Sequence, residues 1–381
     1  MYSAGLIASL ARAGAKVEVL CLARNGADAV DSGLAEFPLW QRVPARPEAP
    51  WRSLLSLLPN VAWRASRGDI RDELRRQLER RHWDCIVIDA LHAAWAVGVV
   101  AAHRARAEQE WLEPNLVYVA HNHEETMRRR VASATRGDPL RRLALSIDAG
   151  KAAALERRLA EEADLVTAIT DEDGVRFRAQ RNGRPVIVLN PGYDGPRLME
   201  RTITPATSLV AVMVGSFHWF AKRMNLERFI AVADPIFAKA GAELRIVGDG
   251  PPEMFERLCP NVTATRFTRA VEDVWPHLRD ARLAIVPEEI GGGFKLKVLD
   301  YVFNRVPIAA LEGSVAGIPL SAPDSMLAFP TLRDLAKGAV EAMSDCRALD
   351  RIQERAFATC AGRFDWRTRG AALCQAITEL P

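Results

Sequence analysis

The sequence lacks the features that mark several classes of protein. Its six cysteines are scattered without a CxxC pair, which argues against a zinc ribbon or a disulfide framework and fits a reducing compartment. No apolar run approaches the ~18 residues of a membrane-spanning helix, and no signal peptide precedes the first expected helix. Lys and Arg number 51 against 48 Asp and Glu, so the net charge of +3 provides no large positive field. These absences predict a cytoplasmic protein without a nucleic-acid partner.

The composition is that of a globular chain long enough for more than one core. Of the 381 residues, 49% are hydrophobic and 26% are charged, and this length favours about two domains. Short apolar runs alternate with amphipathic stretches, which is typical of parallel sheets with helices on both faces. We expect strands at 17–22, 85–88, 116–120, 165–169, 186–189, 209–214, 243–247, 262–267, 283–286 and 308–310, and helices that include 4–13, 70–81, 151–163, 226–239 and 295–303.

The series of strands and helices occurs twice, with a break rich in proline and glycine at 190–208. This pattern predicts two Rossmann-like domains, one over 1–195 and one over 206–355. The first begins with a helix instead of the strand and glycine-rich turn that open a doubly wound domain, so we expect its first strand to be missing. Either the sequence begins downstream of that strand or the domain lacks it.

Residues 40–83 interleave four tryptophans with arginines. Trp40, Trp51, Trp63 and Trp83 could form an amphipathic surface that contacts an anionic membrane or a lipid-linked acceptor, at the inner face of the membrane. Alternatively, the segment is an insertion that packs its own tryptophans and leaves the arginines in solvent. Acidic residues in the same stretch dilute the charge and favour the second interpretation slightly.

One stretch combines a strand end, three consecutive glycines and a helix start. The backbone amides of Gly291, Gly292 and Gly293 can turn toward an anion, and the helix that follows adds its partial positive charge. Lys295 and Lys297 stand near the helix start, where the helix dipole favours acidic residues. Because the chain has only seven lysines against 44 arginines, two lysines here indicate a phosphate site. A mobile loop before a basic helix start is the structural alternative.

This stretch resembles the signature of GT-B glycosyltransferases, in particular the retaining enzymes of family four. Their pattern is Glu-Gly-(Phe/Tyr)-Gly, a helix with a second Glu, and a small-residue turn into a Pro-Val strand. Aligned on Phe294, Gly292 stands where the first Glu is expected and Asp300 where the second is. In the family the second acid holds the ribose hydroxyls of a nucleotide sugar, which the resemblance assigns to Asp300. The first acid contacts the donor sugar, and either Glu288 or Glu289 is a candidate to replace it.

Further matches follow the expected strands of the second domain. Similar enzymes have Gly-x-(Leu/Phe) after the first strand and then a basic residue that neutralises the donor diphosphate. A fixed cation there stabilises the charge that bond breaking leaves on the phosphate. We assign this role to Lys222, with Arg223 second; an exposed lysine at a helix start is the alternative. The family's Val-Gly-x-Gly-Pro loop and base-reading segment imply nucleotide contacts at Gly248, Gly250, Phe267 and Thr268. The resemblance further implies sugar contacts at Gly215, Glu289 and Phe294.

In the first domain, a strand leads into the sequence His-Asn-His-Glu. It resembles the family's His-Asn-x-Glu, whose histidine lies near the donor sugar, and it stands where α/β sheets bind ligands. We therefore assign His121 to positioning the sugar and helping the acceptor lose its proton, with His123 and Glu124 as weaker candidates. A structural histidine at a strand end is the alternative. Two histidines without a third ligand argue against a metal site.

The resemblance covers nearly the whole chain, and a match at 364–366 implies that the helix in 356–381 returns to the first domain. It predicts two Rossmann-like domains that face each other across a cleft. It also predicts a metal-independent retaining transferase that moves a sugar from a nucleotide diphosphate sugar to a hydroxyl acceptor in polysaccharide, glycolipid or glycoconjugate synthesis. The nucleotide sugar is a co-substrate, so no cofactor is expected. The alternative is an inactive GT-B-like protein that binds nucleotide sugar or serves as a scaffold, which the glycine at the first acidic position favours.

Overall fold

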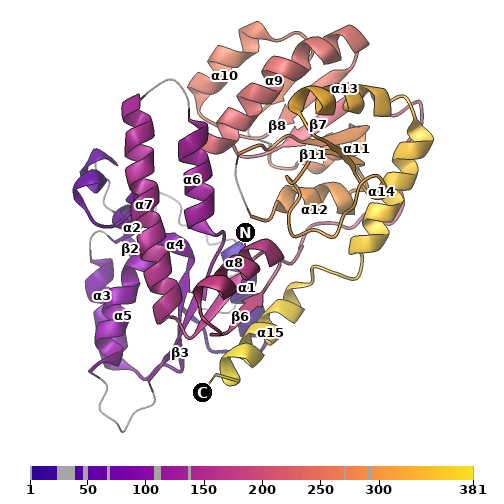
Figure 1. The fold of residues 1–381 in the computed structure, drawn as a ribbon. Helices are drawn as coiled ribbons and strands as arrows, with labels where there is room; N and C mark the ends of the chain where they lie inside the picture. Colours follow the sequence, from indigo (N-terminus) through magenta and orange to yellow (C-terminus); the bar gives the residue numbers. More distant parts are fainter. Residues whose placement is uncertain are drawn as a thin grey trace. The chain divides into compact units, whose positions relative to one another are not determined.

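The computed structural model describes residues 2–23, 39–45, 50–66, 69–106, 113–135, 139–269, 271–290 and 293–380. The chain divides into two compact units (Figure 1). Unit 1 comprises 1–192 and 365–381, and unit 2 comprises 193–364. Both are built from parallel strands and helices, as the alternation of apolar runs predicts.

The described residues of unit 1 carry two separate parallel sheets. One pairs β1 with β2, and the other has the order β3-β4-β5-β6. The unit opens with helix α1 instead of a strand, as predicted. Its elements are α1 (Tyr2–Arg12), β1 (Glu18–Ala23), β2 (Leu39–Pro44), η2 (Pro50–Leu55), α2 (Asn60–Ala65), α3 (Ile70–Arg80), β3 (Cys85–Asp89), α4 (Ala90–Ala93), η3 (Ala94–Ala96), α5 (Val97–Arg104), β4 (Asn115–Val119), α6 (Glu124–Ala134), α7 (Pro139–Glu162), β5 (Leu165–Ala168), α8 (Asp171–Gln180), β6 (Val186–Val188) and α15 (Trp366–Thr378).

The terminal helix α15 belongs to unit 1 and packs against α1. The two backbones approach so closely at Gly370 that a Cβ atom there would lie 2.0 Å from the carbonyl oxygen of Ser9. Trp366 at the start of α15 lies against the ring of Tyr2, with ring centroids 5.6 Å apart. Gly370 therefore lets the last helix close over the first helix of the same unit.

Unit 2 holds one six-stranded parallel sheet in the order β12-β11-β10-β7-β8-β9. In chain order these strands run 6-5-4-1-2-3, which is the strand order of the Rossmann fold. The elements are β7 (Val210–Val214), α9 (Phe220–Ala240), β8 (Glu243–Val247), α10 (Pro252–Leu258), η4 (Cys259–Asn261), β9 (Thr265–Thr268), α11 (Trp275–Asp280), β10 (Leu283–Val286), α12 (Leu296–Phe303), β11 (Ile308–Leu311), β12 (Leu327–Phe329), α13 (Leu332–Ala342) and α14 (Cys346–Cys360).

Both faces of this sheet are buried, which explains why its strands are apolar without alternation. Ala211 and Met213 of β7 point into a core with α9 and α13, whereas Val210 and Val212 point into a second core with α12 and α14. Figure 1 shows α9 and α13 on one side of this sheet and α12 on the other. The two cores hold the carboxyl ends of β7 and β10 rigidly side by side.

Most expected strands are present within one or two residues, and β8 has the predicted bounds. The start of β9 is wrong by three residues, and β2 and β12 were not expected. Helix α7 begins at Pro139, twelve residues before the predicted start. Its added turns carry Leu140, Leu143 and Ile147 on an exposed face, so they lack the burial by which helices are usually recognised.

Candidate functional site

The strand order of unit 2 marks where a ligand binds. The chain winds outward in one direction from β7 and in the other direction from β10, and these two strands are neighbours. In open α/β sheets the crevice at such a reversal, beyond the carboxyl ends of the strands, is the usual ligand site. The segments after β7 and β10 are those in which sequence patterns predict the donor site. The topology therefore brings these segments together.

A close backbone contact holds the turns after β7 and β8. Gly248 has φ +139°, and a Cβ atom there would lie 1.8 Å from the carbonyl oxygen of Gly215. The N–H of Gly248 donates to the carbonyl of Thr268, at 2.9 Å, and the N–H of Phe217 donates to that of Asp249, at 2.7 Å. Gly215, Gly248 and Thr268, all predicted site residues, thus lie at the same edge of the sheet. Gly250 follows directly, and its N–H donates to the Asp249 carboxylate at 2.8 Å.

The lysines predicted to bind phosphate lie close enough to affect each other. Partial desolvation lowers the pKa of Lys222, the charge of Lys297 lowers it further, and the carboxylate of Glu288 opposes both. Lys297 forms an ion pair with Glu288, and both side chains are nearly buried. Lys222 itself is exposed. Two ammonium groups therefore share one carboxylate, which leaves local positive charge at the carboxyl ends of β7 and β10.

The two glutamates after β10 differ in their surroundings. Glu289, the predicted sugar contact, is partly exposed and pairs with Arg228 at 3.4 Å. Glu288 is nearly buried, and its Oε2 has no hydrogen-bond partner among the described residues. Because a buried carboxylate oxygen without a donor is costly, Glu288 is better placed than Glu289 to accept a hydrogen bond from a ligand.

Asp300 lies on the first turns of α12, where the resemblance implies a ribose contact. Burial raises its pKa to about 6, although a hydrogen bond from the Tyr193 hydroxyl lowers it. Tyr193 also stacks on Phe303, with ring centroids 4.7 Å apart. Tyr193 is the first residue of unit 2 and was not among the predicted site residues.

Two further contacts fix the backbone around these residues. Asn225 of α9 is buried and holds Ile290 in both directions: its amide donates to the Ile290 carbonyl at 2.6 Å and accepts from the Ile290 N–H at 3.0 Å. The Tyr301 hydroxyl accepts from the N–H of Val214 at 2.8 Å, which ties α12 to the end of β7. Helices α9 and α12 thus position the loops that follow β10 and β7.

The remaining predicted residues of unit 2 are distributed as follows. Gly291 and Gly292 lie outside the described residues, whereas Gly293 has φ +71° and precedes α12. Lys295 directly precedes α12 and Lys297 lies in its first turn. Arg223 donates to the carbonyl of His218 at 3.3 Å. Phe294 packs edge-on against Phe364, and Phe267 against Phe255, so both rings are partly used in packing.

In unit 1 the site centres on His121 at the carboxyl end of β4. Its Nε2 lies 2.8 Å from Oδ1 of Asp89, the last residue of the neighbouring strand β3. Burial would raise the pKa of Asp89, but the hydrogen bond and charge of His121 outweigh it and lower the pKa. The ionised carboxylate accepts a hydrogen bond from Nε2–H, which favours the tautomer that carries its lone pair on Nδ1. No motif pointed to Asp89; its place at the end of the adjacent strand was the available signal.

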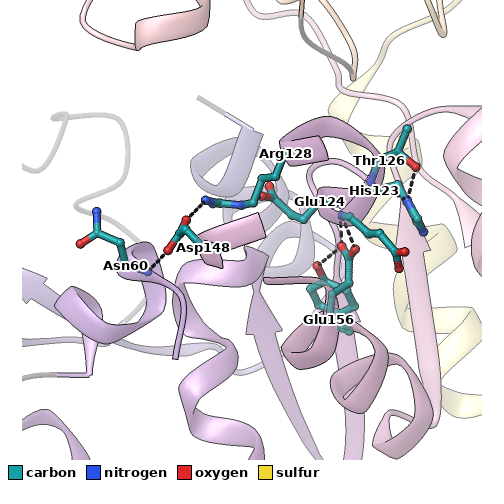
Figure 2. A network of polar contacts seen from close by, with 9 residues as sticks. Asn60, His123, Glu124, Thr126, Arg128, Asp148 and Glu156 are labelled. Atoms are coloured by element: carbon teal, nitrogen blue, oxygen red, sulfur yellow. Dashed lines mark hydrogen bonds and ion pairs between the residues drawn. The ribbon is translucent and has the colours of Figure 1, made fainter. Parts of the chain in front are cut away.

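The weaker candidates in unit 1 have structural contacts. His123 is buried at the start of α6, where its Nδ1 contacts the Thr126 hydroxyl at 2.8 Å and its Nε2 contacts Gln180 at 2.9 Å. Glu124 pairs with Arg128 at 2.7 Å (Figure 2). These contacts fit the N-terminus of α6 more closely than a ligand site.

Glu156 of α7 accepts hydrogen bonds from the start of α6 and from β4. It accepts the N–H groups of Glu124 and Glu125, both at 2.9 Å, and the Tyr118 hydroxyl at 3.2 Å. Burial raises its pKa to about 8, against the lowering effect of the two backbone N–H groups. Glu156 therefore fixes the segment that follows His121.

Three of the four tryptophans between 40 and 83 are buried or half-buried. Trp63 is buried in the core, and the indole nitrogen of Trp83 donates to the Gln77 carbonyl. The ring nitrogen of Trp40 is also buried. Of the four, Trp51 alone is a large exposed side chain. For the described residues, the insertion interpretation accounts for three of these four tryptophans.

Within the described ranges, no group of three or more His, Cys, Asp or Glu side chains is arranged to hold a metal ion. The chemistry that the described residues offer is therefore that of hydrogen bonds and fixed charges: an ammonium cluster, a buried carboxylate and an Asp–His pair.

Comparison with known proteins gives two family matches. Residues 1–197 match the model described as Glycosyltransferase Family 4, and residues 208–345 match the model described as Glycosyl transferases group 1. A search of curated proteins finds no match.

Solved structures share the fold. Sucrose-phosphate synthase from Thermosynechococcus elongatus is 15% identical, with a TM-score of 0.70 over 98% of this chain and 91% of that one. Anabaena HepE, solved with UDP and glucose, is 15% identical, with a TM-score of 0.62 over 99% and 96%. TarM is 11% identical, with a TM-score of 0.61 over 81% of this chain, which spans only 58% of TarM. At these identities the similarity shows the GT-B fold.

Proposed function

The chain belongs to glycosyltransferase family 4, and we propose that it moves a sugar from a nucleotide diphosphate sugar to a hydroxyl acceptor with retention of configuration and without a metal ion. The observation that carries this proposal is the pair Lys222 and Lys297 beside the ends of β7 and β10. Two neighbouring ammonium groups, of which one pairs with the Glu288 carboxylate, are electrostatically unfavourable, and a bound diphosphate would relieve this.

In the proposed donor complex, Lys222 and Lys297 bind the diphosphate, and Arg223 and the glycines at 291–293 add donors. Asp300 accepts the ribose hydroxyls, and the turns that contain Gly248 and Gly250 approach the nucleotide. Solved structures with this fold contain UDP and UDP-glucose, which supports a nucleotide sugar as ligand. Glu288, rather than Glu289, is our candidate to accept a hydroxyl of the sugar, because its Oε2 is buried without a described donor.

The chemistry requires charge stabilisation at the leaving group and a path for one proton. As the bond between sugar and phosphate breaks, the sugar becomes oxocarbenium-like and the phosphate gains negative charge, which the lysines stabilise. The acceptor oxygen then forms the new bond on the same face, and its proton passes to the departing phosphate. His121, held by Asp89, orients the acceptor. Exclusion of water around the ligands would limit hydrolysis of the donor.

We further propose that the acceptor belongs to polysaccharide, glycolipid or glycoconjugate synthesis and that the protein acts in the cytoplasm. The membrane contact predicted through residues 40–83 stays a prediction, and Trp51 is its exposed tryptophan.

The test replaces the two lysines. Lys222→Ala and Lys297→Ala should each lower release of sugar from UDP-glucose or GDP-mannose, whichever the wild type turns over, by roughly 10²-fold or more. Lys239→Ala, at the exposed end of the same helix α9, should leave turnover unchanged. Rates close to wild type in both site variants would refute the phosphate assignment.

The same assay separates the enzyme from an inactive binding protein. If calorimetry shows that UDP or GDP binds while no sugar is released with any acceptor or with water, the chain is a nucleotide-sugar binding protein. If the lysine variants bind nucleotide as tightly as wild type but turn over the donor more slowly, the lysines stabilise the departing phosphate in the transition state more than the bound nucleotide.

A further inference from the structure

Large apolar side chains are concentrated on one surface of unit 1. Seven of the twelve large hydrophobic residues that the described chain exposes come from two segments, η2 with the turn that follows it and the first half of α7. Leu57 is 95% exposed, Leu55 85% and Leu140 79%. Isolated exposed leucines are ordinary, but a cluster of this kind marks an interaction site. We call this cluster the leucine face: Trp51, Leu54, Leu55, Leu57, Leu140, Leu143 and Ile147.

The two segments form one continuous surface. Leu140, Leu143 and Ile147 follow the spacing that places residues on one side of a helix, and Lys151 comes one turn later on that side. The ammonium group of Lys151 donates to the carbonyls of Ser53 and Leu54, at 3.1 and 2.9 Å. The apolar side of α7 therefore leads directly onto η2.

Asp148 of α7 forms hydrogen bonds to the two neighbouring helices α2 and α6. Its carboxylate accepts the N–H of Asn60 at 2.6 Å and the guanidinium of Arg128 at 2.9 Å (Figure 2). This ties α2, α6 and α7 together, so the leucine face is presented by packed elements. Because its segments are anchored by buried or paired polar groups, changes to its exposed side chains should leave the fold intact.

Exposed arginines lie within the two segments of the leucine face. Residues 50–66 contain two arginines and no acidic residue, and so do residues 139–147. Arg128 and Arg129 of the neighbouring α6 add no net charge, because they pair with Glu124, Asp148 and Glu125. Arg141 and Arg142 are exposed between Leu140 and Leu143. An apolar surface with a basic border matches the interface of an anionic lipid bilayer, where apolar side chains enter the acyl boundary and arginines contact the headgroups.

We propose that the leucine face docks unit 1 on a membrane that carries anionic lipids. A second copy of the chain fits less well, because a symmetric contact would place this surface against itself and bring arginine near arginine. Within the described ranges no helix has the length and apolar composition to cross a bilayer, so the contact is peripheral. It involves α7, which lies outside the 40–83 segment, and omits the buried Trp63. Membrane binding needs no glycosyl transfer, so the two proposals can fail separately.

The experiment is co-sedimentation of the full chain with vesicles of phosphatidylcholine alone or with 30% phosphatidylglycerol. We expect sedimentation with the anionic vesicles, at least tenfold weaker partition into phosphatidylcholine alone, and release in 1 M salt. The triple variant Leu55→Ser, Leu57→Ser and Leu143→Ser should weaken partition by about tenfold or more. Arg141→Gln with Arg142→Gln should also weaken it about tenfold at low salt.

A matched control changes exposed apolar residues elsewhere. Val175→Ser, Met199→Ser and Leu209→Ser should sediment like wild type, and circular dichroism should show that both triple variants are folded. The proposal is overturned if wild type does not bind anionic vesicles, or if the leucine-face variant binds as well as the control. It is equally overturned if light scattering shows a wild-type dimer that only the leucine-face variant loses, since the surface then binds a second copy.

Discussion

Replacement of Asp300 by asparagine should stabilise the chain at neutral pH while it impairs donor binding. Burial raises the pKa of Asp300 to about 6 from its ordinary 3.8, so ionisation of this carboxyl increasingly opposes folding as the pH rises above about 4. The shift of about two units corresponds to about 3 kcal/mol. Asparagine has nearly the same shape, stays neutral, and can still accept the hydrogen bond from Tyr193.

The sign follows from linkage. Since the pKa is higher in the folded than in the unfolded chain, the stability associated with Asp300 is fully present below about pH 4 and is lost as the pH rises through 6. About 2 of the 3 kcal/mol falls between pH 4.5 and 8. Asp300→Asn removes this dependence, so its advantage over wild type should grow by roughly 4–8 °C in melting temperature over that interval.

Thermal unfolding of both proteins, followed by circular dichroism from pH 4.5 to 8, measures this difference. Parallel curves, with the same gap in melting temperature at every pH, would refute the buried-acid reasoning. The effect of the substitution on catalysis is measured separately. We expect kcat/KM for the donor to fall by about tenfold, because the ribose hydroxyls lose an anionic acceptor. A variant that is more stable and equally active would leave the burial argument intact and contradict the ribose assignment.

Three further substitutions test other parts of the structure. Asp89→Asn should lower kcat by a factor on the order of 10–10² with little change in nucleotide affinity measured by calorimetry, because the histidine after β4 loses the ionised acceptor that fixes its orientation; an unchanged kcat would contradict this. Tyr193→Phe should raise the pKa of Asp300, since the lost hydrogen bond lowers it, and move the acid limb of donor binding to higher pH; an unmoved limb would exclude the contact. Gly248→Ala should lower the free energy of unfolding in urea by roughly 3 kcal/mol or more, because of its positive φ and the backbone clash. At Gly362 an added Cβ would meet nothing within 4 Å, so Gly362→Ala should change the free energy of unfolding by less than about 0.5 kcal/mol. Equal effects of the two substitutions would show that the clash at Gly248 is relieved.

The elements of the fold were predictable where burial dictates the residue pattern. Strand β8 has its predicted bounds because a strand covered on both faces needs a short, largely apolar run. Strand β12, Leu327–Phe329, has only three residues, too few to show a pattern. The first half of α7 was missed because its apolar side, Leu140, Leu143 and Ile147, is exposed to solvent.

The site was predictable as separate segments and not as contacts. Sequence motifs indicated the turns that carry Lys222 and Lys297, but their proximity depends on β7 and β10 being neighbours, which follows only from the strand order. Asp89 and Tyr193 were not predicted as site residues. Asp89 is brought to His121 by the pairing of β3 with β4, and Tyr193 is brought to Asp300 by packing against α12.

The direction of the pKa shift separates Asp300 from the structural carboxylates of unit 2. Burial would raise the pKa of Asp234, but backbone N–H groups and a hydroxyl bind its oxygens and lower the pKa instead. A backbone N–H donor lowers the pKa of Asp249, and the Ser208 hydroxyl with Arg245 lowers that of Asp280. By contrast, burial raises the pKa of Asp300, because the hydrogen bond from the Tyr193 phenol lowers it by less than burial raises it. A carboxylate that burial has desolvated without supplying enough donors gains most from ligand hydroxyls, which is what a ribose offers. Structural carboxylates have their donors already, so the direction of the shift at Asp300 favours a role in binding.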